Sequence, residues 1–192
     1  MKPEIMTTSG SYFDFLDPDP DSFTIEDIAY ALSNTCRYGG HCKPFYSVAQ
    51  HCVYVSREVP EEFALHALLH DAHEAFVGDI PSPLKRLLPD FRKIEDIAEE
   101  VVLRKFNVHD STESHRVVKA ADLVALRTER EVLLPPGEEG DAWWWVVTDG
   151  IEVSDQKIEP VSPNKAYLQF LKRFEEIMEE MWYEEAVELQ SC

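Results

Sequence analysis

The segment 65–79 constrains the fold of this chain more than any other part of the sequence. At roughly 100° per residue, its ionisable residues share one arc of a helix and its apolar residues share the opposite arc. A solvated helix face usually carries Lys, Glu, Arg and Gln, whereas this arc combines imidazoles with carboxylates, which suit divalent transition metals. The segment therefore predicts a metal site in the core of a helical protein. The residues in the polar arc are His66, His70, Asp71, His73 and Glu74.

Two further ligand candidates lie elsewhere in the chain. His51 follows Ser47, which is placed to cap a helix. Asp122 lies among the apolar residues of segment 120–126, and a buried carboxylate is costly unless it is paired or binds a metal. The sequence thus offers a histidine, a His70–Asp71 pair and a distant aspartate on three predicted helices.

This order of ligands resembles the HD-domain metal-dependent phosphohydrolases. Further blocks of sequence resemble the small bacterial and phage branch of that family, and the resemblance covers roughly residues 7–180. It implies that His51, His70, Asp71 and Asp122 bind one divalent metal. The matching blocks are Arg37–His41, Tyr46–His51, His70–Ala75, Gly78–Lys85 and Ala121–Asp122.

The resemblance implies a deoxynucleotide phosphohydrolase. Its branch includes 5′-deoxynucleotidases and phage deoxynucleoside triphosphate hydrolases. We expect a triphosphohydrolase, with dATP the favoured substrate, that releases deoxynucleoside and tripolyphosphate. The alternative is a 5′-deoxynucleotidase that converts a dNMP into deoxynucleoside and phosphate. The expected cofactor is Zn, Co, Mn or Fe by ligand type, with additional Mg²⁺ if the substrate is a triphosphate.

The predicted metal would lower the pKa of a bound water and polarise a phosphoryl oxygen. Glu74 lies one turn beyond His70 and is assigned general acid/base work. The resemblance supports that role and makes Asp79 a second catalytic carboxylate. Arg37 would neutralise charge developing on the phosphate.

Lys85 and Arg86 are the remaining phosphate-binding candidates because they follow the Pro81–Pro83 turn directly. The competing interpretation is a pair of solvated surface cations. His66 and His73 lie at the margin of the polar arc, where a supporting or packing role is as plausible as metal binding.

The sequence has four cysteines, without the paired C-x-x-C spacing of common zinc sites. Cys36, Cys42 and Cys52 with His41 and His51 leave a structural zinc site open. Free, buried thiols are the default expectation for a reducing compartment.

The predicted fold is all-α, an HD-domain helical bundle formed by a single domain over residues 1–192. Residues 1–23 are expected to be mostly irregular, and Thr24 and Asp27 have capping-box spacing. A long loop or short hairpin is expected around 137–162; its Trp143–Trp145 run suggests a homo-oligomer interface. The expected helices are 25–34, 47–58, 61–76, 90–107, 113–134 and 163–188.

The charge balance restricts the partners. With 18 basic and 37 acidic residues, the net charge is −19, which argues against nucleic acid polymers and anionic membrane surfaces as partners. A small phosphate ligand remains compatible because a few local cations decide that contact. Without a transmembrane-length apolar run or a signal-peptide core, the chain is expected in the cytoplasm, the host's if it is phage-encoded.

Two other functions stay open at this stage. One is a catalytically inactive HD domain that binds nucleotides or assembles with partners, against which intact Glu74 and Asp79 argue. The other is a cyclic-nucleotide phosphodiesterase with the same metal motif, which the Gly78–Pro81 block disfavours.

Overall fold

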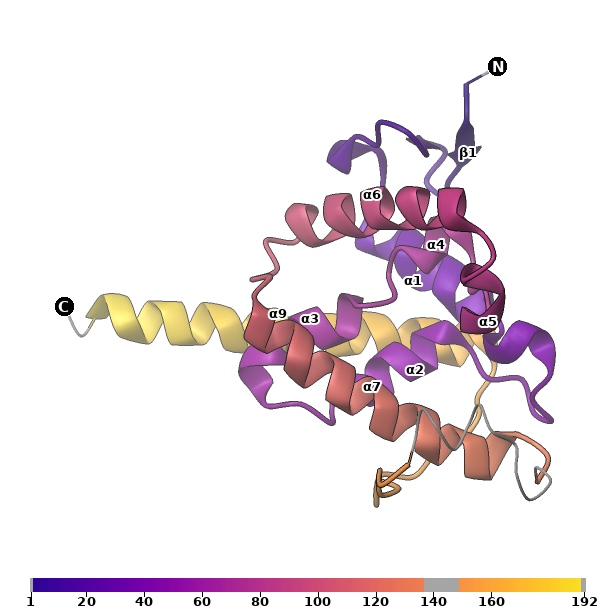
Figure 1. Cartoon of the computed structure of the whole chain (residues 1–192). Coiled ribbons are helices and arrows are strands. Elements are labelled where there is room, and N and C mark those ends of the chain that lie inside the picture. The colour runs from indigo at the N-terminus through magenta and orange to yellow at the C-terminus, as the bar shows by residue number, and fades with distance from the viewer. Residues whose placement is uncertain (1, 137–148, 191–192) are drawn as a thin grey trace.

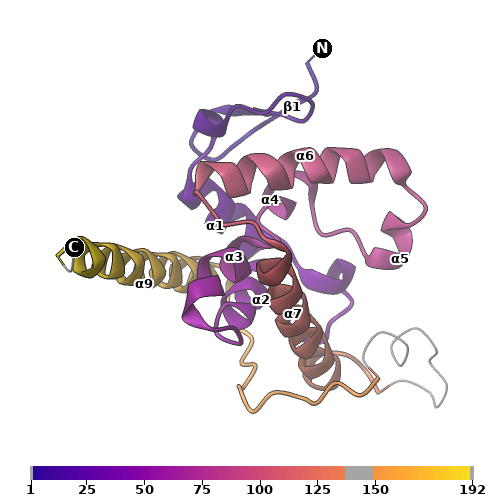
Figure 2. The same ribbon diagram turned by 60° about the vertical axis from the view of Figure 1, so that its left-hand side comes forward.

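The computed structural model describes residues 2–136 and 149–190 and is a helical bundle, as predicted (Figure 1). A short two-stranded hairpin stands at the N-terminal end, and the far end of α9 projects beyond the other helices (Figures 1 and 2). The α-helices are α1 (Ile25–Asn34), α2 (Val48–Val55), α3 (Ala64–Leu69), α4 (Glu74–Val77), α5 (Ser82–Lys85), α6 (Pro89–Lys105), α7 (Thr112–Leu133) and α9 (Pro163–Gln190).

Helix α2 is the centre of the bundle. Every one of its eight residues is buried, and it packs against α1, α3, α7 and α9. A helix that is apolar all round needs such surroundings. Ser47 begins this helix by accepting a hydrogen bond from the Gln50 amide, as its sequence position predicts. Any polar side chain on α2 is consequently held inside the protein, away from solvent.

The capping box predicted at the start of α1 is present. The Thr24 hydroxyl accepts from the Asp27 amide, and the Asp27 carboxylate accepts from the Thr24 amide. The same carboxylate also accepts from the Thr8 hydroxyl and the Ser9 amide, each at 2.7 Å. Asp27 therefore ties the N-terminal segment to α1.

Residues 2–23 are mostly irregular, as expected, but they contain a short hairpin that the sequence did not predict. Strand β1 (Glu4–Met6) pairs antiparallel with β2 (Tyr12–Asp14), with Ile5 opposite Phe13. Each strand has only three residues, too few for periodicity to predict. The hairpin is fixed by Phe13, whose ring is fully buried and stacks on Phe76 of α4 with 3.9 Å between centroids.

The prediction of one continuous helix over residues 61–76 is wrong. A 3₁₀ turn over Glu61–Phe63 precedes α3, and turns over 70–73 separate α3 from α4. The amides of Ala72, Glu74 and Ala75 bond three residues back instead of four. Such tightening changes the rotation per residue, so side chains before and after it no longer share one arc.

The described part of the segment 137–162 is non-helical, as expected, with a turn at Asp149–Gly150. Gln50 of α2 anchors it by donating to the Glu159 carbonyl and accepting from the Val161 amide. The predicted hairpin around Trp143–Trp145 lies outside the described residues, so the homo-oligomer suggested by those rings stays a prediction. No helix in the described chain is long and apolar enough to span a membrane.

Asp27 supplies a test of how the N-terminal segment is held. Burial would raise its pKa, but hydrogen bonds from Thr8, Ser9 and Thr24 outweigh burial and lower it. We expect Asp27→Asn to reduce the free energy of unfolding by about 1–3 kcal/mol in urea titrations at pH 7. Because the folded-state pKa is lowered, this contribution is present above the unfolded value of 3.8 and declines as pH falls through the folded value.

The control for this experiment is Glu26→Gln, on the exposed side of the same helical turn, which should change stability by less than about 0.5 kcal/mol. A destabilisation that is as large at pH 3 as at pH 7 would contradict the role given to the Asp27 carboxylate.

Candidate functional site

His51 is fully buried at the middle of α2. Its Nδ1 lies 2.7 Å from Oε1 of Glu129, which is also fully buried. The pKa of Glu129 is lowered because Arg37 and His51 outweigh the effect of burial, so the carboxylate is ionised and accepts a hydrogen bond from the Nδ1–H group of His51. In neutral His51, the other ring nitrogen, Nε2, then carries a lone pair.

A backbone carbonyl orients the ring of His70, as Glu129 orients the ring of His51. Nδ1 of His70 lies 2.8 Å from the carbonyl oxygen of Ala67, which can only accept, so Nδ1 carries the proton. The Nε2 atoms of His51 and His70 face each other at 3.3 Å. Two imidazoles from different helices thus present their lone pairs to the same point.

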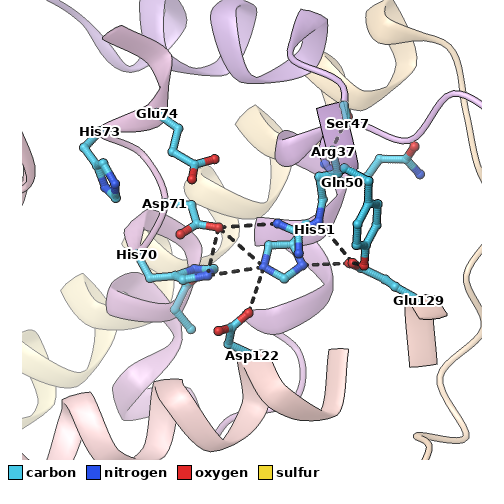
Figure 3. A network of polar contacts seen from close by, with 12 residues as sticks. Arg37, Ser47, Gln50, His51, His70, Asp71, His73, Glu74, Asp122 and Glu129 are labelled. Carbon is cyan, nitrogen blue, oxygen red and sulfur yellow. Dashed lines mark hydrogen bonds and ion pairs between the residues drawn. The ribbon is translucent and has the colours of Figure 1, made fainter. Parts of the chain in front are cut away.

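Two carboxylates complete this convergence (Figure 3). Asp71 places Oδ2 3.3 Å from Nε2 of His70 and 3.5 Å from Nε2 of His51. Asp122, from α7, places Oδ1 3.3 Å from Nε2 of His51. His51, His70 and Asp71 therefore form one cluster, which Asp122 joins through His51. The four predicted ligands come from α2, the turn after α3, and α7.

This donor set fits a divalent cation. Four acceptor atoms that face one another repel unless a positive charge lies among them. Ligand atoms held about 2.1 Å from one ion in tetrahedral geometry lie about 3.4 Å apart, close to the observed spacings. The His51, His70 and Asp71 ligand atoms all lie within 4.8 Å of one another, and imidazole with carboxylate is typical of transition-metal sites.

The pKa shifts within the cluster also indicate a site that binds a cation. Burial and Arg37 disfavour protonated His51, but Glu129 and Asp122 prevail and raise its pKa to about 9. Burial would raise the pKa of Asp71 and of Asp122, yet His51 and His70 lower both well below the ordinary value. The carboxylates are thus ionised, and the site stabilises positive charge at its centre.

Arg37 is buried beside the cluster and is fixed by an ion pair. Its Nε donates to Glu129 at 3.0 Å, and Nη1 lies 3.6 Å from Asp71. It begins a 3₁₀ turn (Arg37–Gly40) in which Tyr38 has φ of 59°. The Tyr38 hydroxyl also donates to Glu129, at 2.5 Å. Glu129 consequently positions both a candidate metal ligand and the candidate phosphate-binding arginine.

Glu74 is 4% exposed and lies beside the cluster (Figure 3). Burial, Asp71 and Asp79 raise its pKa well above the ordinary value, despite the opposing effect of Lys85. Its Oε2 is buried without a hydrogen-bond partner among the described residues, whereas Oε1 lies 3.5 Å from Nζ of Lys85. A buried, protonated carboxylic acid can donate a proton to a bound molecule.

Asp79 reaches this region through a glycine turn. Gly78 ends α4 with φ of 81° and ψ of 158°, a conformation open essentially to glycine alone, and the chain there turns away from the helix axis. Burial and Asp71 raise the pKa of Asp79, whereas Arg37 and Lys85 oppose them. The candidate carboxylate therefore lies within electrostatic reach of both cations.

The two remaining phosphate-binding candidates differ. Nζ of Lys85 contacts both Glu74 and Glu95, so this lysine belongs to a carboxylate network at the edge of the cluster. Arg86 is exposed, and within residues 2–136 and 149–190 no hydrogen bond or ion pair joins its side chain to the site. Only Lys85 is thus placed next to the catalytic candidates.

His66 and His73 lie outside the network around His51, in agreement with the supporting or packing role that was left open for them. Nε2 of His73 lies 3.6 Å from Glu95, apart from that network (Figure 3), because the tightened turns over 70–73 change its rotation relative to His70. The His66 ring contacts His115 of α7, with 5.1 Å between centroids.

Three cysteines are free thiols in the described chain: Cys36, Cys42 and Cys52. Sγ atoms of Cys36 and Cys42 lie 3.7 Å apart. His51, the histidine that a structural zinc site would share, faces His70 and Glu129 instead.

Glu129 is the site residue that the sequence analysis missed. It lies seven residues after Asp122, and therefore on the same face of α7, which was the available signal. We expect Glu129→Gln to weaken Zn²⁺ affinity by about 10- to 100-fold, because His51 loses the group that fixes its tautomer. A competition titration against a chelator would measure this change.

The matched control is Glu131→Gln, since Glu131 is on the same helix but exposed and paired with Arg127. It should keep the affinity of the unmodified protein. Equal affinities for the two variants would show that Glu129 does not support metal binding.

Comparison with known proteins gives three matches. Residues 45–129, which include all four candidate ligands and Glu129, match the family described as 5′-deoxynucleotidase YfbR-like. The chain is 43% identical over 176 residues to YfdR of Escherichia coli, described as uncharacterized, covering 91% of this chain and 96% of that protein. It is 34% identical over 135 residues to an uncharacterized protein of Rhodobacter capsulatus, covering 64% of this chain and 69% of that protein.

Proposed function

This chain belongs to the YfbR-like 5′-deoxynucleotidase family of HD-domain phosphohydrolases, and from that membership we propose that it hydrolyses deoxynucleoside 5′-monophosphates. The observation that carries the proposal is the cluster of His51, His70 and Asp71, with Asp122 in contact with His51. These four residues would hold a divalent transition metal. Such an ion would supply Lewis acidity, which polarises a phosphoryl oxygen and lowers the pKa of water.

The proposed reaction breaks the bond between phosphorus and the 5′ oxygen of the nucleotide. The oxygen of water forms the new bond to phosphorus, so the products are a deoxynucleoside and inorganic phosphate. The side chains have two tasks in this reaction. They must neutralise the phosphate charge, and they must supply a proton to the departing 5′ oxygen. Arg37, Lys85 and Glu74 are the groups assigned to them.

Arg37 is assigned the neutralisation of the phosphate charge. Its guanidinium is held rigidly by Glu129 at 3.0 Å, so little reorganisation is required when a phosphate enters. A preorganised cation of this kind stabilises charge that develops in the transition state. Lys85, at the edge of the cluster, adds a second positive charge.

Glu74 is assigned the protonation of the departing 5′ oxygen. Its pKa is raised well above the ordinary value by burial, Asp71 and Asp79, which favours the protonated form, and its Oε2 has no hydrogen-bond partner in the described structure. It can therefore give its proton to the 5′ oxygen as the bond to phosphorus breaks. Asp79, whose pKa is also raised, is the candidate that orients the attacking water.

Two observations support the monophosphate over the dATP triphosphohydrolase that the sequence analysis preferred. The family description names 5′-deoxynucleotidases. In addition, Arg86 is exposed outside the cluster. The triphosphate version relied on Lys85 and Arg86 together to neutralise the charge of the β- and γ-phosphates, and only Lys85 lies beside the site. We therefore take the 5′-deoxynucleotidase as the proposed activity.

A substrate panel tests this proposal. Purified protein with Zn²⁺, Mn²⁺ or Co²⁺ should release phosphate from at least one of dAMP, dGMP, dCMP and dTMP, and turn over the matching ribonucleotide less well. Chelation should abolish the release, and added metal should restore it. Products are resolved by ion-exchange chromatography.

The same panel separates the alternatives. Deoxyadenosine with tripolyphosphate from dATP, and no turnover of dAMP, would favour the triphosphohydrolase. Turnover confined to a cyclic nucleotide would favour a phosphodiesterase. Metal binding without turnover of any nucleotide would favour the inactive binding module.

A Glu74 variant tests the division between chemistry and metal binding. We expect Glu74→Gln to keep its fold and its metal, while kcat falls by about 100-fold or more because the proton donor is lost. Elemental analysis of the purified variant gives the metal content. The control is Glu100→Gln, because Glu100 is an exposed residue of α6. Loss of metal together with activity would mean that Glu74 is itself a ligand.

A further inference from the structure

A second cluster of metal-binding side chains lies outside the site described above. His66 comes from α3, Asp110 from the loop before α7, and His115 from the first turns of α7. A ring nitrogen of each histidine and a carboxylate oxygen of the aspartate all lie within 4.8 Å of one another. Two imidazoles and a carboxylate form a donor set that transition metals favour.

His66 provides an independent sign that this cluster lacks a ligand. The residue is 4% exposed, yet its buried Nδ1 has no hydrogen-bond partner in the described structure. An unpaired buried polar atom is costly. The His115 ring stands edge-on to it at an interplanar angle of 76°, and His115 forms an ion pair with Asp110.

The cluster is also open to solvent. Asp110 and His115 are about half exposed, with side-chain exposures of 50% and 55%. A hollow of about 230 Å³ adjoins His66, and Glu61, Glu62 and Glu180 line it. An acidic entrance of this kind raises the local concentration of cations.

We propose that His66, Asp110 and His115 bind a divalent transition-metal ion distinct from the one expected at His51 and His70. Its place in the fold gives it a positioning role. His66 lies one turn before His70, and His115 lies two turns before Asp122 on α7. An ion joining these residues would fix α7 against α3, and so set the spacing between ligands of the first site.

The test counts bound ions. Metal-stripped protein is equilibrated by dialysis against micromolar Zn²⁺, and zinc per chain is measured by elemental analysis. We expect two equivalents for the unmodified protein and one for His115→Ala or Asp110→Asn. The matched control is His109→Ala, which removes an exposed histidine that lines the hollow but is not in the three-residue cluster, and it should keep two.

Thermal unfolding gives a second readout. The melting temperature of the unmodified protein should rise again when the second equivalent is added, and this rise should be absent in His115→Ala. Both altered side chains are about half exposed, so the variants should fold. Equal zinc counts in the unmodified protein and in His115→Ala would overturn the proposal, whatever the total, because the proposed site would then bind no ion. These counts do not depend on nucleotide hydrolysis, so they separate its failure from failure of the proposed function.

Discussion

The hydrogen bond between His51 and Glu129 is the interaction on which the site depends. Both residues are fully buried, and an isolated charge at that depth would be strongly destabilising. Glu129 is tolerated because it accepts from Arg37 and Tyr38 as well as from His51. One carboxylate thereby fixes the tautomer of a metal ligand and the position of a phosphate-binding cation. Because Glu129 lies on α7 and its partners lie on α2 and in the 3₁₀ turn before α2, the site can form only when the bundle is packed.

The central position of α2 follows from the same requirement. A metal site that must lower the pKa of water and stabilise phosphate charge works best where water is scarce. Placing His51 on a helix buried on every side meets that condition. The other ligands reach it from the turn after α3 and from α7, so the cluster forms where three elements meet, and no single segment contains it.

Most helices, and the residues that cluster around His51, could be predicted from the sequence. His51, His70, Asp71 and Asp122 were identifiable because imidazoles and carboxylates are unusual in apolar helical surroundings and because their order resembles a known family; their binding of a metal stays a prediction. The bounds of helix α1 were predicted correctly because Thr24 and Asp27 form a local capping box. Glu129 was missed because its partners are 78 and 92 residues away. Its spacing of seven residues from Asp122 was a local signal, but a glutamate late in an amphipathic helix ordinarily faces solvent.

The break after α3 shows where helical periodicity stops describing this segment. Periodicity assumes a constant rotation per residue, whereas the chain tightens over 70–73 and bonds three residues back. His73 follows the start of this tightening and contacts Glu95 instead of the network around His51. His66 precedes the tightening by one helical turn, and its ring contacts His115 of α7. The run of ionisable residues is therefore divided: His70 and Asp71 face His51, whereas His66 and His73 contact other helices.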